Sequence, residues 1–247
     1  MSSEHLGLEQ VDADGAIRET AHEATESLAG DTRLDFFKKA GLTGGAMVGG
    51  GALLSALVPG TALGSKTAPR GGRDARPPAS FGAGDIGILN YALTLEYLER
   101  AFYNEAAKNN RKGKYRLGGR EKNFLMAVAR DERAHVKYLE KALGSNAVAE
   151  PKFDFGKTTS DRKLFLQTAF ALENTGVGAY SGQAFNIVDP SILAAALSIV
   201  TIEARHAGVI GGLIKGDKGI APDGPFDDPL DANQVLKAVG KTGFIKG

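Results

Sequence analysis

The sequence predicts an all-α protein whose centre is a four-helix bundle, and two observations support this fold class. Residues 85–216 contain four long stretches in which apolar side chains recur every three or four positions, as on one face of a helix. Two of these stretches carry the pattern Glu-x-x-His within the apolar stripe. Four helices of about 20 residues or more are typical of a bundle with functional side chains in its core.

The stretch 119–144 shows most clearly that polar side chains occupy positions that are expected to be buried. Its predicted buried stripe is formed by Phe124, Val128, Glu132, His135, Leu139 and Ala142. Burying an ionised carboxylate costs several kcal/mol unless the charge is paired or bound to a metal. The stretch therefore predicts a helix ending at Gly144 whose acid and imidazole face a partner in the core.

The other three helices follow from the same periodicity and from local capping signals. The first, over 85–108, is apolar nearly all round and is expected to be buried on more than one side. The third is expected from about residue 161, with Ser160 as its N-cap. The fourth is expected to begin at Asp189 and Pro190 and to stop at Gly216.

The remaining segments are assigned by composition. They are a polar, disordered leader (1–32), an export-signal-like or membrane-anchor segment (33–65), a Pro/Gly/Arg linker (66–84) and an irregular C-terminal tail (217–247) with one short helix near 233–239. The run TRLDFFKKAG resembles a twin-arginine export motif in which Leu34 replaces the second arginine. We expect an exported, periplasmic or cell-surface protein; the alternative is membrane anchoring through residues 40–65.

Charge and cysteine content exclude several function classes. The net charge of +1 provides no basic field for nucleic acid. The absence of cysteine excludes disulfides, thiolate catalysis and thiolate-held iron–sulfur clusters. The sequence leaves the oligomeric state open.

Six side chains, distributed over the four predicted helices, form the candidate metal site. In chain order they are Glu96, then Glu132 with His135, then Glu173, then Glu203 with His206. Four carboxylates supply the charge that neutralises two divalent ions, and oxygen with imidazole ligands favours two Fe or two Mn ions. Glu99, one turn after Glu96, is the alternative ligand from the first helix.

Other residues near this set are open to a functional or a purely structural interpretation. Tyr103 and Tyr180 each follow an acid by seven residues, and either serve in redox or hydrogen-bonding roles or are core aromatics. Asp131 either accepts the free ring N–H of a ligand histidine or is simply exposed. Gly176, Gly178 and Gly182 permit close helix packing or a ligand channel. A third Glu-x-x-His, at Glu19 and His22, lies in the polar leader and is assigned to a solvated segment.

Four segments carry a family resemblance: LNYALTLEYLERAFY, RDERAH, FALENTGVGAYSGQA and IEARHAG. They are similar to the ferritin-like di-metal carboxylate superfamily, and most like the exported ferritin-like domain proteins related to plant desiccation-related proteins. The resemblance covers residues 85–215. It implies Glu132 and Glu203 as bridging carboxylates and the other four side chains as terminal ligands. It also implies that dioxygen or peroxide reacts at the metals.

Two functions of different classes follow from this pattern. The first is a redox enzyme that oxidises Fe(II), or dismutates peroxide, during oxidative or desiccation stress. The second is a non-catalytic stress or desiccation protein in which the metals only staple the bundle. A third, weaker interpretation is a membrane-tethered binding module.

Overall fold

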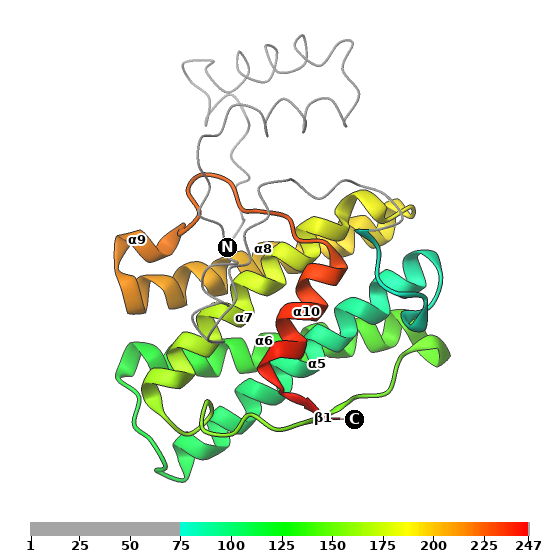
Figure 1. Cartoon of the computed structure of the whole chain (residues 1–247). Coiled ribbons are helices and arrows are strands. Elements are labelled where there is room, and N and C mark those ends of the chain that lie inside the picture. Colours follow the sequence, from blue (N-terminus) through cyan, green and yellow to red (C-terminus); the bar gives the residue numbers. More distant parts are fainter. Residues whose placement is uncertain (1–74, 247) are drawn as a thin grey trace, which may run out of the picture. The chain divides into compact units, whose positions relative to one another are not determined.

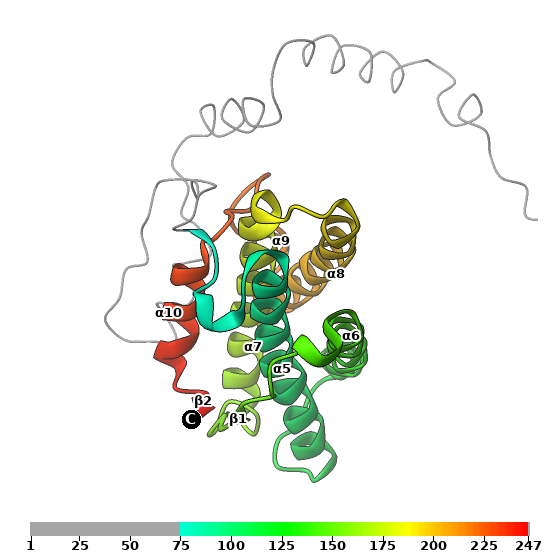
Figure 2. The same ribbon diagram turned by 90° about the vertical axis from the view of Figure 1, so that its right-hand side faces the viewer.

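The computed structural model describes residues 75–246. The predicted leader and export segment, together with Glu19 and His22, lie outside the described residues. Within residues 75–246 the all-α prediction is confirmed. The long helices are α5 (Gly84–Arg111), α6 (Gly119–Leu143), α7 (Arg162–Gln183) and α8 (Pro190–Lys215), arranged as a bundle (Figures 1 and 2).

Short elements connect and cover these four helices. They are η2 (Ala79–Phe81), η3 (Gly144–Asn146), η4 (Ala184–Asn186), α9 (Asp217–Ile220), α10 (Ala232–Thr242), β1 (Lys152–Phe153) and β2 (Ile245–Lys246). The two strands pair antiparallel, which ties the end of the chain to the α6–α7 connection. The strongest packing is between α5 and α6 and between α7 and α8, so the bundle consists of two helical hairpins.

The capping signals explain where the helices begin and end. The prediction of Ser160 as the N-cap of the third helix is wrong by one residue, because the Asp161 side chain accepts the hydrogen bond from the Leu164 N–H at 2.9 Å. Ser160 Oγ bonds back to the Lys157 carbonyl instead. At α8 the prediction is confirmed: Asp189 caps the helix and Pro190 is its first residue. Gly144 and Gly216 end α6 and α8 with positive φ angles of 54° and 62°.

The core is centred on α5, which is buried on most sides as its composition predicts. Phe102 and Phe165, from α5 and α7, stack with ring centroids 5.6 Å apart. In contrast, α8 exposes about half of Leu197 and Val209. Among residues 75–246, α8 is the one helix with the length and apolar composition of a membrane span. In this bundle α8 lies against α6 and α7.

The C-terminal segment packs on α7 at two of its glycines. The predicted short helix is present as α10, which begins with a capping box formed by Asp231 and Gln234. Just before it, the Leu230 N–H donates to the Gly178 carbonyl at 2.8 Å. A Cβ at Gly182 would lie 1.7 Å from the Leu230 carbonyl oxygen, so only glycine permits this approach. These two glycines therefore serve close packing rather than a ligand channel.

This contact predicts the effect of two matched glycine substitutions. Gly182→Ala should lower the free energy of unfolding by about 1–3 kcal/mol, because Leu230 must move away from α7. Gly240→Ala is the control, since Gly240 is an exposed residue of α10 and a methyl group there would meet no atom within 4 Å. The control should leave stability unchanged or raise it by about 0.5–1 kcal/mol. Urea unfolding of both variants measures the difference. Equal stabilities would contradict the role given to Gly182.

Candidate metal centre

Six polar side chains from all four long helices meet in the middle of the bundle. They are Glu96, Glu132, His135, Glu173, Glu203 and His206, each at most 8% exposed. They form two overlapping groups, and within each group the ligand atoms lie within 4.8 Å of one another. One group has Glu96 and His135, the other has Glu173 and His206, and both include Glu132 and Glu203. The structure thus brings together every side chain of the predicted ligand set.

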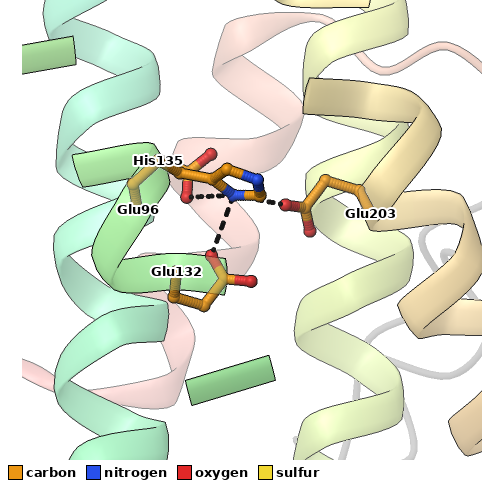
Figure 3. A group of neighbouring side chains, drawn as sticks. All are labelled: Glu96, Glu132, His135 and Glu203. Carbon is orange, nitrogen blue, oxygen red and sulfur yellow. Dashed lines mark ion pairs between the residues drawn. The ribbon is translucent and has the colours of Figure 1, made fainter. Parts of the chain in front are cut away.

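The first group is arranged around the His135 ring (Figure 3). Its Nδ1 lies 3.3 Å from Glu96 Oε2, 3.4 Å from Glu132 Oε2 and 3.1 Å from Glu203 Oε1. Carboxylates from α5, α6 and α8 therefore surround one ring nitrogen. None of these contacts has hydrogen-bond geometry, so Nδ1 is buried without a hydrogen-bond partner.

The second group repeats this arrangement around His206. Its Nδ1 lies 3.1 Å from Glu173 Oε2 and 3.3 Å from Glu132 Oε1. Its Nε2 lies 3.3 Å from Asp131 Oδ2, the contact that the sequence predicts for an outer carboxylate. The two oxygens of Glu132 are therefore divided, with Oε2 facing His135 and Oε1 facing His206.

Two tyrosines orient the outer carboxylates, and they do so across the two hairpins. Tyr180 on α7 donates its hydroxyl proton to Glu96 Oε1 at 2.6 Å. Tyr103 on α5 donates to Glu173 Oε1 in the same way. Each of these acids thus has one oxygen held by a tyrosine and the other turned toward a histidine. The sequence spacing identified the tyrosines, but not that each serves the acid of the other hairpin.

Burial and crowding hold protons in this cluster. Burial, together with the charge of Glu96, raises the pKa of Glu132 to about 7. Burial and the Glu132 charge raise the pKa of Glu203 well above its usual range. Burial alone would lower the pKa of His206, but the adjacent Glu132 and Glu173 raise it to about 11. The raised pKa values of these groups favour protons that offset part of the carboxylate charge, and bound cations would offset the same charge.

The unsatisfied atoms of the cluster fit a set of metal ligands. Both oxygens of Glu132, both oxygens of Glu203, Glu96 Oε2 and His135 Nδ1 are buried without a hydrogen-bond partner. Such orphaned groups are costly in an ordinary core. Glu121, a buried acid at the start of α6, has the ordinary solution, because Arg162 and the Gly118 N–H both donate to it. The cluster's carboxylate oxygens and imidazole nitrogens could instead hold metal ions.

Two openings lead toward the cluster. A groove between α6 and α8 reaches His135 and is lined by Tyr138, Ser198 and Ile202 among others. On another side, a small apolar cavity of about 20 Å³ is bounded by Tyr180, Ala92 and Ile199 among others. This volume is enough for a molecule of about the size of water. The cluster is buried, with a mainly apolar groove reaching His135 and a small apolar cavity next to Tyr180.

The alternative ligand Glu99 lies outside both groups, although it is buried at 4% exposure. Glu96 is the α5 acid that contacts a group histidine. The third Glu-x-x-His, at Glu19 and His22, is outside the described residues. The sequence offers Glu99 only as a substitute for Glu96, whereas the structure buries both.

A family model for the ferritin-like domain matches residues 84–216, which is more than half of the chain and includes α5 to α8. The chain belongs to the ferritin-like family. A comparison with curated proteins finds no match. The matched region contains every residue of the two groups, so the ferritin-like domain and the buried Glu/His cluster coincide.

The cross-hairpin hydrogen bonds of this ferritin-like domain predict unequal effects of two tyrosine substitutions. Tyr180→Phe should lower the free energy of unfolding by about 1.5–3 kcal/mol, because a buried carboxylate loses its donor. Tyr138→Phe is the control, since Tyr138 is 50% exposed and should be neutral. Chemical denaturation in the presence of a chelator separates this effect from metal binding. Two neutral substitutions would show that the Tyr180–Glu96 contact does not hold the site.

Proposed function

We propose that this protein binds two Fe or two Mn ions and is an oxidoreductase that oxidises Fe(II) or reacts with dioxygen or peroxide. The observation that carries the proposal is the division of the Glu132 oxygens between two histidine-centred groups, together with their lack of other partners. A carboxylate placed in this way suits a bridge between two cations. When bound, the ions would supply the redox chemistry and a position for the oxidant.

Different residues of the chain would hold the two ions. Glu132 and Glu203 belong to both groups and would bridge the ions, as the family resemblance implies. The other four ligands, two on each side, would hold one ion each: Glu96 with His135, and Glu173 with His206. Four carboxylates balance the charge of two divalent cations, which removes the repulsion that the metal-free cluster offsets with protons.

The groove and the cavity are the two routes by which an oxidant would reach the site from solvent. The groove at His135 is the opening through which ions or peroxide would reach the site, and the small apolar cavity at Tyr180 suits dioxygen. Tyr103 and Tyr180, bonded to the outer acids, are positioned for hydrogen bonding or redox support. Residues 33–65 favour an exported protein, and we place its activity in oxidative or desiccation stress outside the cytoplasm.

The ligand assignment predicts the metal content of two variants. Glu132→Ala should lose the bound ions and the activity together, because one side chain serves both groups. Glu19→Ala should lose neither, because that Glu-x-x-His lies in the polar leader. Elemental analysis of purified protein measures both. Unchanged metal content in Glu132→Ala would remove Glu132 from the site, and metal loss in Glu19→Ala would bring the leader into it.

A catalytic metal centre and one that only stabilises the bundle differ in the number of substrate turnovers they perform. A ferroxidase supplied with excess Fe(II) in air should oxidise iron repeatedly, with oxygen uptake continuing beyond the ions first bound. A manganese-loaded, catalase-like protein should release oxygen continuously from added peroxide. A single stoichiometric oxidation, or none, would favour the alternative in which the metals only stabilise the bundle. Stopped-flow absorbance with an oxygen electrode distinguishes these outcomes.

A further inference from the structure

Another buried acid, Glu99, lies beside the six-residue cluster. It is 4% exposed, and within residues 75–246 its carboxyl makes no hydrogen bond or ion pair. The outer acids Glu96 and Glu173, in contrast, each contact one tyrosine and one histidine. Among the described residues, no donor therefore explains why an acid is buried at this position.

The two hairpins repeat one pattern, since each carries an outer acid followed seven residues later by a tyrosine. This repeat shows which position on α7 corresponds to Glu99. Glu96 on α5 corresponds to Glu173 on α7, so the counterpart of Glu99 is Gly176, three residues after Glu173. A Cβ at Gly176 would lie 3.2 Å from Glu203 Oε2 and 3.5 Å from Glu99 Oε1. Both carboxylates thus border the volume that this glycine leaves free. The two halves of the site are unequal at this point, with an acid on one helix and no side chain on the other.

The oxygen of Glu203 that borders this volume is the one turned away from His135, since Oε1 makes the 3.1 Å contact with the ring. Glu203 Oε2 itself has no hydrogen-bond partner. Two acids therefore border this space, and no hydrogen bond from residues 75–246 reaches either of them there. Burial and the charges of Glu203 and Glu132 also raise the pKa of Glu99 well above its usual range. A cation next to Glu203 would satisfy both groups at once.

We propose that Glu99 is a seventh ligand of this centre, supplying a carboxylate oxygen to an ion bound at Glu203 from the side that Gly176 leaves open. This inference rests on the proposed two-ion site. It makes the two ion positions unequal, because the repeat provides no matching acid on α7. The added carboxylate raises the ligand charge from −4 to −5, which favours ions of higher charge at that position.

Binding of Co(II) to the metal-free full chain tests this assignment, by titration calorimetry and by visible absorption, which reports the coordination of each ion. Glu99→Gln keeps the size of the side chain but removes the anionic ligand. It should weaken one of the two binding steps by about 10–100-fold and change the Co(II) absorption, while the other step is retained. Gly176→Ala, which places a methyl group between Glu99 and Glu203, should weaken the same step.

The control is Glu121→Gln, which alters a buried acid that pairs with Arg162 and should leave both binding steps and the spectrum unchanged. Thermal unfolding without metal should be the same for Glu99→Gln and the native protein, because no hydrogen bond is lost. If Glu99→Gln does not fold, Glu99→Asp takes its place and should show the same selective weakening through its shorter reach. Two unaltered steps in the folded variant would overturn the role of Glu99 and leave the two-ion site standing. A native protein that binds no Co(II) would overturn both.

Discussion

Four carboxylates are buried side by side in the core, and the stability of the fold depends on how their charges are offset. Glu96, Glu132, Glu173 and Glu203 are each at most 1% exposed. Removing such groups from water and bringing like charges together are both unfavourable, and the effects add. The raised pKa values of Glu132, Glu203 and His206 favour protons that offset part of this cost, and bound cations would offset it with direct bonds. The buried cluster therefore has the charge and the side chains that could hold metal ions.

The surrounding helices hold these acids in position. Each hairpin supplies one outer acid and one Glu-x-x-His pair, and each outer acid is held by a tyrosine from the opposite hairpin. The aromatic stack between α5 and α7 fixes the spacing of these two helices. The segment at Leu230 lies against the glycines of α7 and closes its outer side. Rigid helices are the better support for a ligand set, because ligand positions then follow from backbone register.

The sequence predicted the bundle and the six side chains that cluster in it, because the polar residues lie within apolar stripes that can be recognised locally. An acid and an imidazole within an apolar stripe are visible without knowing any tertiary contact. Choices between close neighbours were harder. Ser160 and Asp161 can both cap a helix, and only the backbone geometry selects Asp161. On a helix buried on most sides, periodicity cannot separate Glu96 from Glu99, since both face protein. The pairing of each tyrosine across hairpins also depends on packing that no single segment encodes.

Everything proposed for this protein requires two cations, one in each of the two histidine-centred groups. Anomalous diffraction from crystals of the full chain soaked in Mn(II), measured against a chelated control, tests this occupancy most directly. We predict two peaks, one next to His135 and one next to His206, with Glu132 between them. Peaks elsewhere, or a cluster that stays empty while the acids keep their protons, would contradict the two-ion centre.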